Sequence, residues 1–271
     1  MKKIALTSLL TVFAVSGAHA ANVIDGNPLY MPKAGHFYSV TSVESHTEQS
    51  TPWTLGEDFG YGISDKLAVE VSTSATENDN FDHMSWDDLS LQLTFRALDM
   101  GAWKLDVIGA YGVDGVYPDH APFLKKTNTD YGWAAGVRGG YTTSKFTVAG
   151  TAAFYYTNTE SFNWNEDEGK QGVHALALGL DAQFVIDNNW NLVATAAYTG
   201  ILDDELYGTP GWKIKNAGTW FGEFGVNYNL DATKFVGAYI NGSLNHHGGT
   251  AADEWEWDDG FGFGVKFGID F

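Results

Sequence analysis

The sequence predicts an all-β protein, a transmembrane antiparallel β-barrel of about twelve strands, with ten strands as the alternative. Three observations lead to this fold class. Apolar side chains recur at every second position, short turns alternate with long polar loops, and aromatic residues flank the short turns. Alternation with period two indicates strands that have one apolar face. A soluble β-sandwich shares this alternation, so the loops and the aromatic residues decide between the two folds.

The N-terminus has the pattern of a secretory signal peptide. Lys2 and Lys3 form a positive start, residues 4–15 form a short apolar stretch, and residues 18–20 (AHA) match a small-x-small cleavage site. We therefore expect three parts in the chain: a signal peptide at 1–20, a periplasmic N-terminal lead-in at 21–33, and a transmembrane β-barrel at 34–271.

The expected strands lie between the connections, and the last strand shows the alternation best. From Phe261 to Phe271 every second residue is apolar, and the residues between them are small or polar. An even number of strands returns both termini to the periplasmic side. The twelve expected strands are 34–44, 51–61, 67–75, 87–98, 103–113, 131–141, 146–157, 172–185, 190–201, 217–229, 235–244 and 259–271.

Two of these strands fit the pattern less well. Residues 34–44 have no clean apolar face, and Glu57 falls on the lipid side of the strand at 51–61. A β-bulge near Gly56 would return Glu57 to the inner face. If either segment is not a strand, the barrel has ten strands and the N-terminal part lies in the lumen.

The connections alternate in length, as in membrane barrels with short periplasmic turns and long extracellular loops. The short ones are 62–66, 99–102, 142–145, 186–189 and 230–234, and the long ones are 45–51, 75–87, 113–130, 157–171, 202–216 and 245–258. Aromatic rings favour the headgroup level of a bilayer. The expected periplasmic aromatic girdle is Tyr61, Phe95, Trp103, Tyr141, Phe146, Phe184, Trp190, Tyr228 and Phe235. Candidates for the opposite girdle are Trp53, Tyr111, Trp133, Tyr156, Tyr198 and Trp220.

The inner face of these strands combines charged residues with many small ones. Twelve strands lined by small residues are expected to leave a narrow, water-filled path. The alternative is that the acids and bases pair into a network that plugs the lumen. The charged candidates for the lumen lining are Asp58, Glu70, Asp88, Arg96, Lys104, Asp106, Arg138, Asp181, Glu223, Lys266 and Asp270.

Composition and charge exclude several classes of function. A net charge of −19 argues against nucleic-acid binding, and the lack of Cys excludes disulfides and thiolate sites. We expect no metal and no cofactor, since the adjacent His246 and His247 point to opposite sides of an extended chain. No enzyme is expected, because the carboxylate pair Asp87-Asp88 lacks a nearby histidine at a catalytic spacing.

The end of the chain resembles a known class. Residues 261–271 resemble the C-terminal signal of bacterial outer-membrane barrels, in which a terminal aromatic residue follows alternating apolar ones. The resemblance implies an assembly signal at Phe267, Ile269 and Phe271, recognised by the barrel-assembly machinery, and a place in the outer membrane of a Gram-negative bacterium. Residues 31–36 (MPKAGH) and 61–67 (YGISDKL) resemble the opening of the family associated with phenol-degradation pathways. That likeness implies a channel for hydrophobic or aromatic compounds.

These observations favour a porin-like barrel that forms a narrow, cation-preferring passive channel for small solutes. The alternative is a structural or surface-interaction barrel whose acidic loops contact lipopolysaccharide or a partner. The loop acids at 166–168, 203–205 and 253–259 suit a solvated surface, divalent-cation bridges to lipopolysaccharide phosphates, or a cation-attracting mouth. Expected partners are outer-membrane lipid, lipopolysaccharide, the assembly machinery and small solutes.

Overall fold

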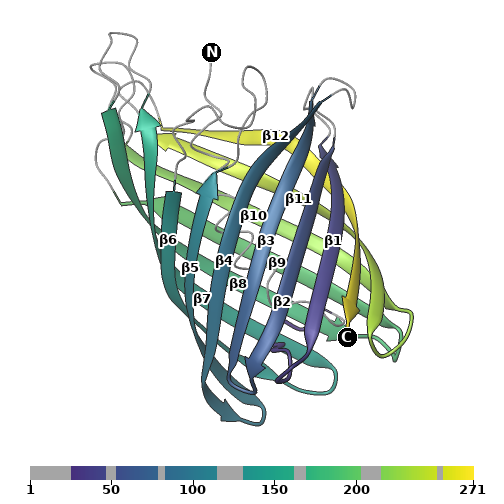
Figure 1. The fold of residues 1–271 in the computed structure, drawn as a ribbon. Helices are drawn as coiled ribbons and strands as arrows, with labels where there is room; N and C mark the ends of the chain where they lie inside the picture. The colour runs from purple at the N-terminus through teal and green to yellow at the C-terminus, as the bar shows by residue number, and fades with distance from the viewer. Residues whose placement is uncertain are drawn as a thin grey trace.

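The protein is a closed barrel of twelve antiparallel strands (Figure 1). The computed structural model describes residues 26–46, 53–78, 83–114, 131–161, 169–202, 215–248 and 253–271. Over these ranges, no helix is long and apolar enough to cross a membrane. The strands are β1 (Phe37–His46), β2 (Thr54–Ser64), β3 (Leu67–Asn78), β4 (His83–Met100), β5 (Trp103–Asp114), β6 (Tyr131–Thr142), β7 (Phe146–Ser161), β8 (Gly169–Val185), β9 (Trp190–Ile201), β10 (Lys215–Asn229), β11 (Lys234–Gly248) and β12 (Asp253–Asp270). The prediction of twelve strands is confirmed, and the ten-strand alternative is wrong.

Pairing of β1 with β12 closes the barrel. The register runs from Tyr38 opposite Asp270 to His46 opposite Gly262. At the end of this ladder, Phe37 and Phe271 exchange two backbone hydrogen bonds of 2.7 and 2.9 Å. Unpaired backbone groups cost several kcal/mol each in hydrocarbon, which explains why a spanning sheet closes on itself.

The five expected short turns are confirmed and lie at the end of the barrel that holds the C-terminus (Figure 1). Only residues 65–66, 101–102, 143–145, 186–189 and 230–233 remain between the paired strands. In the second turn Gly101 has φ +73°, a conformation that other residues rarely adopt, and its N–H donates to Asp99 Oδ1 at 3.0 Å.

At the opposite end the strands extend further than expected. β4 begins at His83, β7 continues to Ser161, and β12 begins at Asp253, so much of the expected loops 75–87, 157–171 and 245–258 is paired strand. Polar residues led us to expect loops there, whereas the ladder hydrogen bonds continue. A register shift after Gly242 accommodates the extension of β11 against β12. The acidic groups at 166–168 and 203–205 lie outside the described residues.

The apolar face of the barrel points outward. Along β4, Leu91 is 45% exposed, whereas its neighbour Gln92 is 8% exposed and faces the lumen. Phe263 and Val265 on β12 are likewise exposed on the outer face. Such a continuous exposed apolar surface is expected of a barrel surrounded by lipid rather than by water.

Glu57 is an exception on this outer face, and no bulge at Gly56 returns it to the inner face. β1 pairs with β2 without a register shift from Phe37 opposite Tyr61 to Glu44 opposite Thr54. Glu57 therefore stays on the outer face, where it accepts hydrogen bonds from Ser39 Oγ at 2.5 Å and Thr41 Oγ1 at 2.6 Å. The hydroxyl groups that interrupt the apolar outer face of β1 therefore donate hydrogen bonds to a lipid-facing carboxylate.

Candidate functional site

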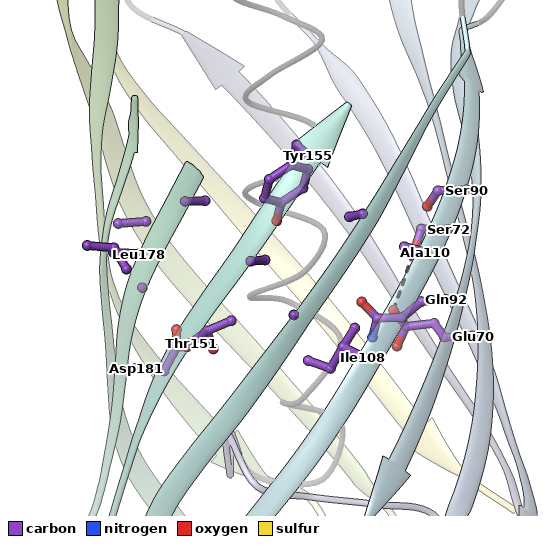
Figure 2. A pocket seen from close by; sticks show the side chains of 16 residues that line it. Glu70, Ser72, Ser90, Gln92, Ile108, Ala110, Thr151, Tyr155, Leu178 and Asp181 are labelled. Atoms are coloured by element: carbon purple, nitrogen blue, oxygen red, sulfur yellow. Dashed lines mark hydrogen bonds between the residues drawn. The ribbon is translucent and has the colours of Figure 1, made fainter. Parts of the chain in front are cut away.

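The middle of the lumen contains a cavity of about 740 Å³, including the space open to solvent, which we call the chamber. Its lining comes from β3 to β9, and Figure 2 shows the polar and the small side chains that face it. Glu70 and Asp181 are the acids in this lining, and no basic residue is among the described residues that line it.

One wall of the chamber is polar. Glu70 and Ser72 on β3 lie beside Ser90 and Gln92 on β4 (Figure 2). Glu70 accepts a short hydrogen bond from the Tyr38 hydroxyl and a longer one of 3.5 Å from Ser72 Oγ. Hydroxyl groups therefore hold this carboxyl group.

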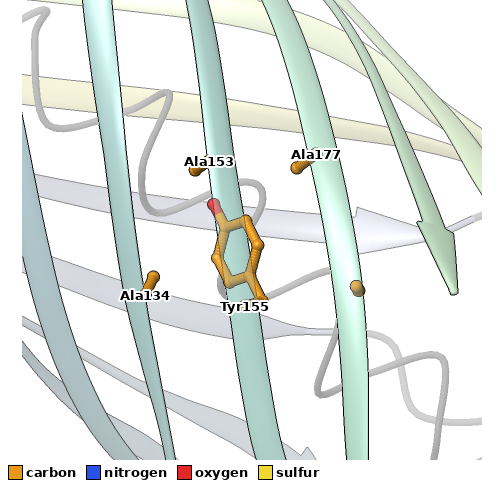
Figure 3. Packing of buried hydrophobic residues seen from close by; sticks show 5 residues of the cluster. Ala134, Ala153, Tyr155 and Ala177 are labelled. Atoms are coloured by element: carbon orange, nitrogen blue, oxygen red, sulfur yellow. The ribbon is translucent and has the colours of Figure 1, made fainter. Parts of the chain in front are cut away.

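The other wall is built from small residues around one tyrosine. Tyr155 on β7 has Ala134 on β6 and Ala175 on β8 as its cross-strand partners. Figure 3 shows its ring among the small side chains of Ala134, Ala153 and Ala177. At Gly136 an added Cβ would lie 2.6 Å from the Cβ of Ala153, so this wall has no room for a side chain there. Farther along the wall, Asp181 accepts a hydrogen bond of 2.8 Å from Thr195 Oγ1.

Towards the periplasmic turns, Arg96, Asp106 and Arg138 form a compact group that we call the arginine belt. They lie opposite one another on β4, β5 and β6 and are almost fully buried. Arg96 Nε donates to Asp106 Oδ1 at 2.7 Å, and Arg138 Nη2 donates to Asp106 Oδ2 at 2.8 Å. One carboxylate thus pairs with two guanidinium groups in a rigid fork geometry.

A second buried ion pair lies on the opposite strands. Lys266 Nζ on β12 is 3.4 Å from Glu223 Oε1 on β10, and it lies 5.1 Å from the centre of the Tyr239 ring. Near it, Asn241 Nδ2 donates to Glu44 Oε2 at 2.8 Å. In the described part of the lumen, the buried Arg96, Arg138 and Lys266 are therefore paired with carboxylates.

Residues 26–33, which we call the plug segment, lie inside the periplasmic end of the barrel. Pro28 and Leu29 are buried there, and Arg96 Nη2 donates to the Leu29 carbonyl at 2.8 Å. The Tyr30 hydroxyl donates to Asp270 Oδ2 at 2.9 Å. Burial and the Asp270 carboxylate raise the pKa of Tyr30 well above its usual value, so this phenol remains a donor.

Sequence reasoning placed residues 21–33 in a periplasmic lead-in and did not anticipate this insertion. The local signal is an Asx turn, in which Asn27 Oδ1 accepts the N–H of Leu29 at 2.9 Å. Together with the short apolar run of residues 28–31, it indicates a compact turn, but its partner Arg96 is distant in the sequence. Residues 21–25 lie outside the described residues.

The structure places the predicted lumen residues as follows. Eight have buried side chains on the inner face: Glu70, Asp88, Arg96, Asp106, Arg138, Asp181, Glu223 and Lys266. Asp58 is partly buried on β2, Lys104 binds Asp99 at the rim at 3.2 Å, and Asp270 binds the plug segment. Sequence reasoning missed Tyr38, Glu44 and Tyr239, because β1 lacks a clean face and tyrosines were assigned only to the girdles.

The prediction that Phe235 belongs to the periplasmic girdle is wrong. Phe235 is 1% exposed and points into the lumen, where an added Cβ on Gly268 would lie 2.1 Å from its ring. The outward residue at this point is Val236, because Phe235 shares the inner face of β11 with the buried Tyr239 and Asn241. The other eight predicted rings lie on the outer face near the short turns, and Trp190 and Tyr228 are in contact with centroids 4.8 Å apart.

At the opposite rim, the outer face carries the other predicted rings. Tyr198 and Trp220 pack with centroids 4.9 Å apart, and Trp133 and Tyr156 stack at 5.9 Å. Phe267 and Phe271 of the expected assembly signal are exposed on the outer face. In the described part of the chain, no group of three or more potential metal ligands is brought together.

Two solved structures resemble the chain over nearly their whole length. The NanC porin aligns with a TM-score of 0.52 at 10% identity, covering 87% of this chain and 98% of the porin. The fold is that of an outer-membrane β-barrel. The translocator domain of the autotransporter NalP from Neisseria meningitidis aligns with a TM-score of 0.51 at 10% identity, and the alignment covers 98% of this chain and 95% of the translocator domain. No family model matches this outer-membrane barrel, and no curated protein sequence matches it.

Proposed function

We propose that the protein is a narrow passive channel for small solutes in the outer membrane of a Gram-negative bacterium, with a preference for cations. The observation that carries this proposal is the chamber in the middle of the barrel, which is lined by small and polar side chains from β3 to β9. Small side chains such as Ala134, Ala153 and Ala177 occupy positions where larger ones would fill the lumen. The likeness in fold to a porin supports the same function.

The distribution of charge supports the preference for cations. Glu70 and Asp181 face the chamber, whereas the buried bases Arg96, Arg138 and Lys266 are paired with carboxylates outside its lining. A cavity lined by one sign of charge and surrounded by a low-dielectric wall concentrates ions of the opposite sign. Cations would therefore enter the chamber more readily than anions.

The partners proposed for this barrel follow from its outer surface. Lipid contacts the apolar outer face, and the acidic loops meet lipopolysaccharide at the extracellular end. The exposed Phe267 and Phe271 are available to the barrel-assembly machinery.

A second candidate function is a structural barrel with a plugged lumen. The arginine belt and the plug segment favour it, because both fill the periplasmic end of the lumen. The two functions differ in whether ions cross the protein.

Planar bilayers test the proposal. The chain starting at Ala21, and the same chain lacking residues 26–31, are inserted separately and recorded under a salt gradient. We expect discrete conductance steps with a reversal potential on the cation-selective side. If both proteins stay silent in several lipid compositions, the channel function is wrong and the structural barrel remains.

A further inference from the structure

We propose that the plug segment is a gate, which closes the periplasmic end of the channel in the arrangement seen here and leaves it when the channel conducts. This inference rests on the proposed channel function and adds its regulation. Residues 26–33 form the gate, and the arginine belt with β9 and β10 forms its seat.

The plug segment stands directly in the path of a solute. A smaller cavity lies between the plug segment and the chamber, and its lining includes Tyr30 and Met31 from the plug segment. Glu70 and Gln92 line this cavity and the chamber alike. A solute that leaves the chamber towards the periplasm therefore meets the plug segment next.

Two hydrogen bonds between described residues hold the plug segment in its seat. Arg96 Nη2 binds the Leu29 carbonyl at 2.8 Å, and the Tyr30 hydroxyl binds Asp270 at 2.9 Å. Arg96 keeps two hydrogen bonds to Asp106, of 2.7 and 3.2 Å, that do not involve the plug segment. The arginine belt is therefore able to stay intact when the plug segment leaves.

The turn after the plug segment provides a fixed hinge. Gly35 has φ +82°, and its N–H donates to the Gly62 carbonyl at 2.8 Å. The Gly62 N–H in turn donates to the His36 carbonyl at 3.0 Å, and an added Cβ on Gly62 would lie 2.0 Å from the Lys33 carbonyl oxygen. Because this turn is fastened to β2, residues 26–32 are able to swing while β1 keeps its register.

The seat itself favours release. Asn191 and Asn227 lie opposite each other on β9 and β10, are fully buried, and have no hydrogen-bond partner for their side-chain amides in the described structure. Gly26 covers this place, since its added Cβ would lie 2.9 Å from Asn227 Nδ2. Buried amides without partners cost free energy, and water that enters after the plug segment leaves would relieve that cost.

A disulfide bond tests the gate, because the natural chain contains no cysteine. An added Cβ on Gly26 lies 3.7 Å from Val193 Cβ, close to the mean Cβ separation of about 3.8 Å in disulfides. Gly26 has φ +84°, so a cysteine there carries backbone strain, and the reduced double variant is the reference that contains the same strain. The double variant Gly26→Cys/Val193→Cys is recorded in bilayers after oxidation and again after reduction. Both recordings use the same folded protein, so a folding defect does not explain a difference between them.

We expect oxidation to lower the open probability at least about tenfold and reduction to restore it. In the single variants Gly26→Cys and Val193→Cys, the open probability is expected to be the same after oxidation as after reduction, and Gly26→Cys alone measures the effect of the strain at this glycine. Deletion of residues 26–31 is expected to give a channel that is open nearly all the time.

The outcomes separate the gate from the channel. If the oxidised, reduced and deleted forms all conduct equally, the gate is wrong and the channel function stands. If none of them conducts although circular dichroism shows β-structure, both proposals are wrong. Conduction by the deleted form, with silence of the oxidised form, supports both.

Discussion

The arginine belt lies on strands that also line the chamber, and yet the inward side chains of the two regions differ. On β5, Asp106 belongs to the belt, whereas Ala110, four residues further on, faces the chamber. On β6, Arg138 belongs to the belt and Ala134 to the chamber. The comparison teaches that strand number sets the diameter of this barrel, while the inward side chains decide where its lumen is open.

The largest expected effect comes from breaking the belt. Asp106→Ala removes the carboxylate that lies between two buried guanidinium groups, which is expected to cost about 3–5 kcal/mol in the free energy of unfolding. Urea unfolding of the barrel in detergent or vesicles measures this cost. The control Asp181→Asn, in the chamber, removes only the charge of a group bonded to a hydroxyl and is expected to cost about 1 kcal/mol. Equal losses of unfolding free energy in the two variants would show that the arginine belt does not stabilise the barrel more than the chamber acid does.

A smaller effect on stability but a large one on conduction is expected from filling the chamber. Ala153→Phe introduces a ring beside Tyr155 and is expected to reduce single-channel conductance by roughly half or more, because the ring occupies part of the chamber that Ala153 lines. Ala196→Phe places the same ring on the exposed outer face as a control. Unchanged conductance in Ala153→Phe would mean that ions do not pass the small-residue wall.

The smallest expected effect is on selectivity. The double variant Glu70→Gln/Asp181→Asn removes the acids of the chamber and is expected to shift the reversal potential towards zero under a salt gradient. Glu57→Gln removes a carboxylate from the outer face and is expected to leave the reversal potential unchanged. A shift of equal size in both would indicate that charge outside the lumen controls selectivity.

Much of the fold follows from the sequence because a membrane barrel repeats one simple pattern. The alternation along β4 and β12 predicts which side chains face outward, and the short turns fix the antiparallel order of neighbours. β1 was harder to predict, because its outward Ser39 and Thr41 are polar. Both donate hydrogen bonds to Glu57 on the next strand.

The candidate site was predictable only in part. The sequence identifies Arg96, Asp106 and Arg138 as inward residues, but their meeting depends on a register shift between Arg96 and Leu98 that has no signal in the sequence. The seat of the plug segment likewise depends on residues far away in the chain. Phe235 was misplaced because an aromatic residue beside a short turn was assigned to the girdle, whereas the alternation of β11 puts it on the inner face with Tyr239.

The central claim is that the chamber holds water and attracts cations. The variant Ala153→Cys carries a single thiol in the chamber, since the natural chain has none. Its reaction rate is measured with membrane-impermeant thiol reagents of positive and of negative charge. Each rate is divided by the rate of the same reagent with a free thiol. We predict that the introduced thiol reacts with both reagents, and that the cationic one reacts at least about threefold faster because of the nearby acids. A thiol that reacts with neither reagent in the folded barrel would contradict the account.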